Sequence, residues 1–412
     1  MAGVSRSDDA DGLVVTPRPA GTVRQELASG GPAAVLALAR ASRGPVVEQC
    51  GPGHYDVTFV FPAPRPTPRQ VGLFCPALPG GFVLMHDLGD GVFASTARLP
   101  GGTRVAYHFC LDPPAGLGPA ELGALARSAQ GRRIDYLNPD FDQVSLRGLR
   151  LRIVDSLLAL PGSRTAPATR PQRGTAAGSV EEMTIASAEL GRRKEILIYS
   201  PAGPAAGTDP PLVLLLQGNE EWQGRDFLDN LIASGQVRPF AAVVPSERSV
   251  TARLRDFTSG GAHSRFITAE LWPALASRGL ARAEAVVAGY SAGALAATWL
   301  AADEPGMFPR LAAISGAFHL RPAAGLKEPS GGPAPVLDRF RRPGGTPRRA
   351  YLAAGWYEDA WEPAIYDNTA QLARVLRGHG AEVRFDSGPH GHDTVSARAC
   401  LAEGLRWLLG PP

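Results

Sequence analysis

Hydrophobic and polar residues follow one pattern in the first part of the chain and another beyond about residue 179. In the first part, apolar and polar positions alternate at residues 55–61 and 104–111, and an apolar stretch at 71–74 follows a proline-rich turn. Alternation buries every second side chain, as in antiparallel strands with one solvated face. The sequence therefore predicts a β-sandwich over residues 45–160, preceded by an N-terminal extension over 1–44.

Beyond the sandwich, short continuous apolar stretches alternate with helical patterns. Such stretches are typical of strands buried on both faces, so the sequence predicts an α/β domain with a doubly wound, mostly parallel sheet over 179–412. Residues 161–178 are rich in Pro, Gly, Thr and Arg and are predicted to be a linker. The predicted strands are 195–199, 212–216, 241–244, 285–288, 311–315, 349–353 and 383–385, and the predicted helices are 33–40, 264–276, 292–302, 365–379 and 395–409.

Composition narrows the function classes. The 412 residues are 44% hydrophobic and 20% charged, which is ordinary for a globular protein, and the formal net charge of +3 provides no broad field for nucleic acid or an anionic membrane. The first fifteen residues carry acidic side chains where a secretion signal would be basic, so we expect a cytoplasmic location and no membrane partner. Four scattered cysteines form no disulfide framework.

The segment Gly289, Tyr290, Ser291, Ala292, Gly293 lies between a predicted strand and a predicted helix. A serine at such a tight turn takes a strained backbone conformation, and glycine on either side avoids a clash with the neighbouring strand and helix. This context predicts that Ser291 is the nucleophile of a serine hydrolase. The structural alternative is a strand, turn and helix in which the serine plays no chemical role.

A histidine loop follows the last predicted strand. It contains His390 and His392 just before the final predicted helix. Imidazole can take a proton from serine near neutral pH and return it to a leaving alkoxide, and this loop is where an α/β-hydrolase places its base. We favour His392 because it adjoins the helix start. The HxHD spacing also suggests a metal site, but no further ligand cluster accompanies it, so we expect no metal and no cofactor.

The acid and the oxyanion hole are predicted from strand ends. Glu358 follows the strand at 349–353 most closely, whereas Asp359 and Glu362 are alternatives that could cap the next helix. The backbone N–H of Ala292 is one predicted oxyanion donor, because the residue after the nucleophile supplies it. The second predicted donor is the N–H of Asn219, which follows a glycine after the strand at 212–216.

Several of these motifs occur together in one family. The chain has DYLNP at 135–139, GNEEW at 218–222, RLRDF at 253–257, ELWP at 270–273 and GHD at 391–393. In these motifs and in the serine turn, it resembles the enterochelin esterases. These are cytoplasmic serine esterases that open the trilactone of ferric catecholate siderophores to release iron.

The resemblance implies that Ser291 and His392 form the catalytic pair, although some relatives manage with these two residues alone. It also implies that Arg248, Arg253 and Arg255, together with Trp222, contact an anionic catecholate substrate. Guanidinium groups suit that role because they stack on aromatic rings and donate to oxygens. The structural alternative for the arginines is solvation and ion pairing at the surface.

Two other functions fit the same pattern. One is a feruloyl or acetyl esterase acting on carbohydrate, since a β-sandwich also precedes such enzymes. The other is a siderophore-binding protein without catalysis on a hydrolase scaffold. In every case we expect a small-molecule substrate or ligand and no obligate protein partner. The long Pro- and Gly-rich segment 321–348 is a predicted lid or binding loop.

Overall fold

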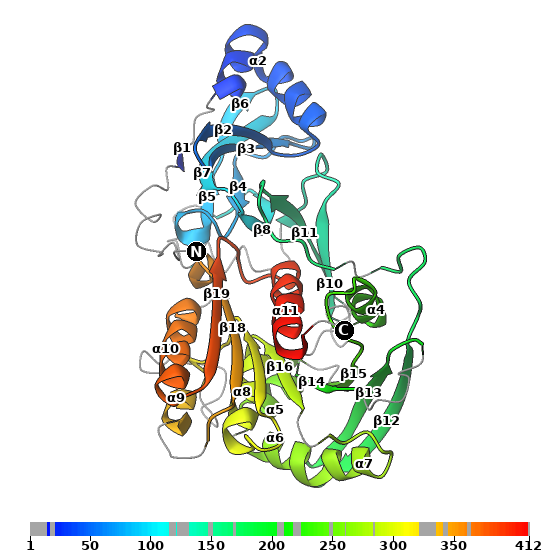
Figure 1. Ribbon diagram of the computed structural model, residues 1–412. Coiled ribbons are helices and arrows are strands. Elements are labelled where there is room, and N and C mark those ends of the chain that lie inside the picture. Colours follow the sequence, from blue (N-terminus) through cyan, green and yellow to red (C-terminus); the bar gives the residue numbers. More distant parts are fainter. Residues whose placement is uncertain are drawn as a thin grey trace.

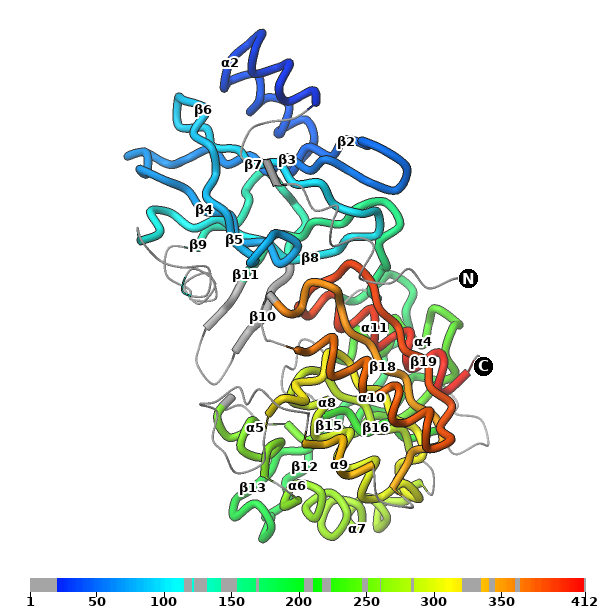
Figure 2. Tube along the Cα trace, turned by 90° about the vertical axis from the view of Figure 1, so that its left-hand side faces the viewer, coloured from blue at the N-terminus to red at the C-terminus, as the bar shows by residue number. Residues whose placement is uncertain are grey.

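The computed structural model is a mixed α/β protein with several sheets. Residues of the first part of the chain lie at one end of the molecule and those of the second part at the other (Figures 1 and 2). The residues that it describes are 15–16, 21–114, 121, 132–146, 151–167, 170–203, 210–216, 224–246, 250–259, 261–282, 285–320, 335–340, 345–360 and 364–410.

The first sheet is antiparallel and is covered on its outer face by a helix. Its strands run in the order β1, β7, β3, β2, with β6 paired to β7. Their bounds are β1 (Val15–Thr16), β2 (Val46–Gly51), β3 (His54–Pro62), β6 (His86–Gly89) and β7 (Val92–Pro100). Helix α2 (Gly21–Ser42) packs Val35 and Ala39 against this sheet. It is longer than the predicted helix at 33–40, and its axis is interrupted at Gly31, just before Pro32.

A second antiparallel sheet faces the first. Its strands run in the order β10, β11, β8, β4, β5, with β9 paired to β8. Their bounds are β4 (Val71–Phe74), β5 (Phe82–Leu84), β8 (Arg104–Leu111), β9 (Arg132–Arg133), β10 (Phe141–Leu146) and β11 (Leu151–Ala159). Alternate residues of β3 and β8 meet between the sheets, with ring centroids 4.9 Å apart for Phe59 and Tyr107. The predicted alternating strands are therefore confirmed.

The third sheet contains eight strands among the described residues. They run in the order β12, β13, β15, β14, β16, β17, β18, β19, and all neighbours from β15 to β19 are parallel. Their bounds are β12 (Ser179–Ser187), β13 (Arg192–Ser200), β14 (Leu212–Leu216), β15 (Ala241–Ser246), β16 (Val286–Tyr290), β17 (Arg310–Ile314), β18 (Arg349–Gly355) and β19 (Glu382–Gly388). The predicted strands all lie within or beside β13 to β19. The edge strand β12 was missed because most of its side chains are exposed.

Helices cover both faces of this sheet. The α8 face includes α5, α7, α9 and α10, and the opposite face carries α4 and α11. The helices are α4 (Arg225–Ala233), α5 (Val250–Phe257), α6 (Ala262–Arg265), α7 (Trp272–Ala276), α8 (Ala292–Asp303), α9 (Pro335–Phe340), α10 (Ile365–Gly378) and α11 (Thr394–Leu409). In β14, Leu214 faces the first core and Val213 the second, which explains why the whole strand is apolar.

The carboxyl ends of the parallel strands point toward the two smaller sheets. Arg104 at the start of β8 forms a bridge with His390, which follows β19. Because the loops after parallel strands gather at this edge, it is where ligand-binding residues are expected.

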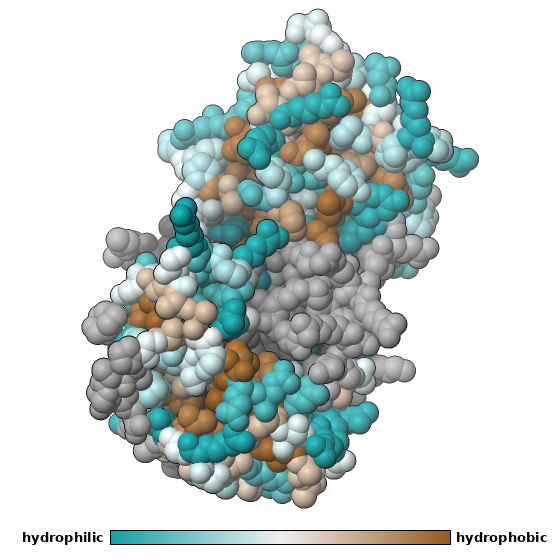
Figure 3. Space-filling model, turned by 90° about the vertical axis from the view of Figure 1, so that its right-hand side faces the viewer, coloured by the Kyte–Doolittle hydropathy of each residue, from teal (hydrophilic) through white to brown (hydrophobic). Residues whose placement is uncertain are grey.

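In the part of the chain that the structure describes, no helix is both long enough and apolar enough to cross a membrane. On the face drawn in Figure 3, hydrophobic and hydrophilic residues are interspersed. Large apolar side chains that are exposed, such as Tyr136 before β10 and Val180 on β12, lie in different parts of the chain. Single exposed apolar residues of this kind are normal for a protein surface.

Candidate active site

Ser291 stands on a tight turn between β16 and α8. Its backbone has φ 55° and ψ −124°, a conformation that non-glycine residues rarely adopt. The turn requires glycine beside it, since a Cβ at Gly289 would lie 2.2 Å from the carbonyl oxygen of Gly293. The N–H of Ser291 donates to the Ile314 carbonyl oxygen at 3.0 Å. The backbone therefore fixes where the Ser291 hydroxyl can point.

His392 meets this hydroxyl from the loop after β19. Its Nε2 lies 3.2 Å from Ser291 Oγ, although the two residues are 101 positions apart in the chain. The imidazole ring stacks on Tyr290, with centroids 4.8 Å apart and an interplanar angle of 28°. Directly after it, Asp393 caps α11 by accepting from the Ser396 N–H at 2.8 Å. The pair has the geometry of a nucleophile and a general base.

His390 points elsewhere. Its Nε2 lies 3.8 Å from Cys400 Sγ on α11, and its side chain is buried. Burial lowers the pKa of His390 to about 4, and the charge of Arg164 acts in the same direction. The ring is therefore neutral at physiological pH and packs between the sheet and α11.

Glu358 is fully buried in the turn after β18, where it begins a 3-10 segment, Glu358–Ala360. Its Oε1 accepts a hydrogen bond from Ser315 Oγ. Burial raises the pKa of Glu358 well above its ordinary value, and the nearby Asp393 and Asp359 raise it further. Of the two alternatives, Asp359 is partly buried in the same turn, and Glu362 lies outside the described residues.

Some of the other predicted site residues lie within the described part of the chain, and some lie outside it. Ala292 is the first residue of α8, where backbone N–H groups have no acceptor within the helix. Arg253 is half-buried and Arg255 is exposed, both on α5. Asn219, Trp222 and Arg248 lie outside the described residues. So do residues 321–334 and 341–344 of the predicted lid, between which α9 is described.

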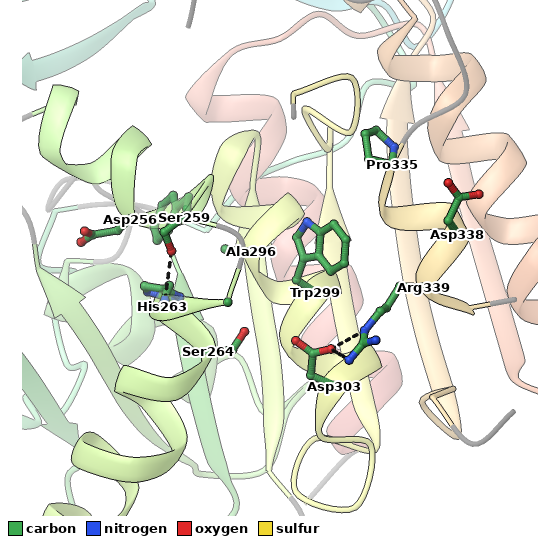
Figure 4. A pocket seen from close by; sticks show the side chains of 12 residues that line it. Asp256, Ser259, His263, Ser264, Ala296, Trp299, Asp303, Pro335, Asp338 and Arg339 are labelled. Carbon is green, nitrogen blue, oxygen red and sulfur yellow. Dashed lines mark hydrogen bonds and ion pairs between the residues drawn. The ribbon is translucent and has the colours of Figure 1, made fainter. Parts of the chain in front are cut away.

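A cavity of about 400 Å³ lies beside α8, on the face that also carries α5, α6 and α9. Figure 4 shows Trp299 of α8 between His263 on one side and the ion pair of Arg339 and Asp303 on the other. The predicted site did not include these residues, because their separation in the sequence gives no signal that they meet. Ala296, one turn of α8 beyond the serine turn, also lines the cavity.

Among the described residues, no group of three or more His, Cys, Asp or Glu side chains is arranged to hold a metal ion.

Comparison with known proteins places the chain in a family. The family model described as "Putative esterase" matches residues 187–393, which is half of the chain. The chain belongs to this esterase family. No curated protein matches it in sequence.

Solved structures extend the likeness to the whole fold. The esterase matches an enterobactin esterase from Shigella flexneri, crystallised in the presence of enterobactin, with a TM-score of 0.72 and 21% identity over 90% of this chain and 97% of that one. It matches the ferric enterobactin esterase from Salmonella typhimurium with a TM-score of 0.72 and 21% identity over 90% and 98% of the two chains. The esterase thus has an enterochelin esterase-like fold across both of its parts.

Glu358→Gln is expected to lower kcat of this esterase by less than about tenfold, because glutamine resembles the neutral carboxyl that burial favours and can still accept from Ser315. Steady-state kinetics on a chromogenic ester measures this. A fall of about 10⁴-fold would instead show that Glu358 works as an ionised carboxylate orienting the base.

Proposed function

We propose that this esterase cleaves esters through an acyl-serine intermediate, with Ser291 as nucleophile and His392 as general base. The observation that carries the proposal is the 3.2 Å separation of Ser291 Oγ and His392 Nε2 on a strained turn. Ser291 Oγ attacks the carbonyl carbon while Nε2 takes its proton. The N–H groups of Ala292 and Asn219 stabilise the oxyanion.

The intermediate then collapses as His392 returns the proton to the leaving alkoxide. Water, deprotonated by the same imidazole, releases the acyl group and restores the serine. Glu358 is our candidate for the third member of the set, acting as a neutral carboxyl because burial raises its pKa, and this is why Glu358→Gln is expected to cost little. The chain order of Ser291, Glu358 and His392 is that of an α/β-hydrolase.

We propose further that residues 179–412 form an α/β-hydrolase domain and residues 45–160 a β-sandwich domain, joined by the linker 161–178. The mostly parallel order of β12 to β19 supports the first assignment, and the two facing antiparallel sheets support the second. Within this division, the nucleophile follows β16 and the base follows β19.

The substrate that we propose is a catecholate siderophore trilactone, with iron as its cargo, hydrolysed in the cytoplasm. The family motifs of the sequence and the enterochelin esterase-like fold support this substrate. Arg253 and Arg255 of α5, with Arg248 and Trp222, are the proposed contacts of the anionic catechol rings.

Purified protein incubated with a catecholate trilactone, iron-free and iron-loaded, tests the proposal. We expect mass spectrometry to detect linear products, and we expect a fluorophosphonate probe to label Ser291. Hydrolysis of feruloylated or acetylated xylan with none of the trilactone would reassign the substrate. Tight binding of the ferric complex without turnover or labelling would reassign the protein as a binding protein.

A further inference from the structure

The loop that carries His392 is attached to the first part of the chain as well as to its own sheet. On the sheet side, the N–H of Trp356 donates to Gly388 O at 2.9 Å, and the N–H of Tyr357 donates to His390 O at 3.2 Å. On the other side, the N–H of Arg104 donates to Pro389 O at 2.9 Å. The loop is therefore held between β18 and the start of β8.

An ion pair anchors the strand end just before this loop. The guanidinium of Arg164 binds Asp386 through both of its terminal nitrogens, and the contact from Nη1 to Oδ2 is 2.6 Å. Tyr351 on β18 also donates its hydroxyl to Asp386, at 2.8 Å. Burial alone would raise the pKa of Asp386, but Arg164, together with Tyr351 and the charge of Arg384, holds that pKa below its ordinary value. A planar guanidinium on a carboxylate fixes orientation as well as distance.

These contacts close into a ring. The side chain of Arg104 donates to the backbone carbonyl of Arg164, so the same residue that binds Pro389 also holds the segment bearing the ion pair. Arg164 binds Asp386, which is three residues before Pro389. Arg104 and Arg164 thus hold Pro389 and Asp386, two positions that precede His392 in this loop and its strand.

Close packing holds part of the loop on this side, where a Cβ at Gly391 would lie 3.3 Å from Pro76 Cβ, but it does not fill the whole interface. A cavity of about 260 Å³ lies between the two parts and is lined by Arg104, Arg164, Pro389, His390 and Cys400. Where side chains do not interdigitate, position depends on the few directional contacts that span the gap.

We propose that Arg164 is a positioning residue for catalysis: by binding Asp386, it holds the His392 imidazole at the distance from Ser291 that proton transfer needs. The first part of the chain is then a component of the catalytic apparatus. This inference rests on the proposed function of Ser291 and His392. A displacement of about 1 Å at a reacting group can lower the rate about a hundredfold, so the effect appears in kcat.

The test replaces Arg164 in the full-length protein. Arg164→Gln is expected to lower kcat on a chromogenic ester about 10- to 100-fold and to slow fluorophosphonate labelling of Ser291 in parallel, with KM changed less than about threefold. Arg164→Lys keeps the charge but loses the two-point contact, so it should recover only part of the activity. Asp386→Asn should act like Arg164→Gln, and the double variant should be no worse than either.

The pair of Arg98 and Asp56 offers a matched control. It joins β7 and β3 away from the His392 loop, also through two guanidinium nitrogens. Its side chains are 44% and 14% exposed, against 40% and 9% for Arg164 and Asp386. Arg98→Gln is therefore expected to leave kcat unchanged while removing a similar ion pair.

The outcomes separate the inference from the function on which it rests. Absence of Ser291-dependent hydrolysis in the wild type would overturn the proposed function. An active wild type with Arg164→Gln equally active, or with Arg98→Gln equally impaired, would overturn the positioning role. Circular dichroism and thermal melting establish that each variant is folded. If Arg164→Gln does not fold, Arg164→Lys and Asp386→Asn decide the question by the same split between kcat and KM.

Discussion

Replacing Ser291 with alanine is expected to lower kcat for ester hydrolysis by about 10⁴- to 10⁶-fold. The variant keeps the turn, because alanine is no larger than serine, but it has no oxygen to attack the ester. Steady-state kinetics and mass spectrometry of the acyl-enzyme measure the loss. A variant as active as the wild type would exclude Ser291 as the nucleophile.

His392→Ala is expected to cause a loss of the same order, and the Ser291→Ala/His392→Ala double variant is expected to be little worse than either single variant. The two groups act as one unit, so removing the second costs little once the first is gone. His379→Ala is the control, because His379 is exposed at the end of α10, and its activity should be unchanged. Additive losses in the double variant would mean that the two residues work independently.

The second large effect concerns stability against pH. Burial lowers the pKa of His263 to about 3 and that of His390 to about 4, from an ordinary value of 6.5. Above pH 6.5 both histidines are neutral in the folded and unfolded states, and their full contribution is present. As the pH falls below 6.5, the unfolded chain takes up protons that the folded chain excludes. Together, His263 and His390 are expected to lower the free energy of unfolding by about 4 kcal/mol between pH 7 and pH 5.

Buried Glu358 titrates in the opposite sense, because its raised pKa makes the folded state bind a proton more strongly as the pH falls. The clean measurement is therefore a difference between proteins. Urea unfolding at pH 7 and pH 5 should show a smaller loss in His263→Phe than in the wild type, by about 2 kcal/mol. Phenylalanine retains a ring against Phe257. The exposed His379→Phe should show the wild-type loss, and an equal loss in His263→Phe would contradict a buried neutral imidazole.

Much of the fold could be predicted from the sequence because buried strands leave a local pattern. The continuous apolar residues of β14 follow from the burial of both faces of that strand. Strands β3 and β8 are also buried over consecutive residues, and their polar positions, such as Thr58 and His108, form hydrogen bonds with other side chains. Strand β12 is exposed along most of its length and gives no such pattern. Gly31 and Pro32 are residues that usually end helices, and the non-helical backbone of Gly31 divides α2 into two helical stretches, of which the sequence predicted the second, at 33–40.

In the site, too, features that depend on neighbouring residues could be predicted from the sequence, whereas contacts between distant residues could not. Gly289 and Ser291 are neighbours on one turn, and backbone geometry ties their residue types to the strand and helix around them. Arg164 and Asp386 are 222 positions apart, and their pairing depends on how the two parts of the chain dock. Composition around Arg164 indicated only a solvated linker, since nothing local distinguishes an arginine in water from one that binds a distant carboxylate.

The order of strands has a consequence for the newly made protein. Ser291, the proposed nucleophile, directly follows β16 inside the third sheet, whereas His392, the proposed base, follows β19. Among the described residues, β19 is an edge strand of that sheet and pairs with β18 alone. Domains generally fold in the order in which the ribosome delivers them. Under the proposed mechanism, a nascent chain therefore completes most of its core before it can hydrolyse an ester, because the imidazole that accepts the proton is placed only when β19 pairs with β18.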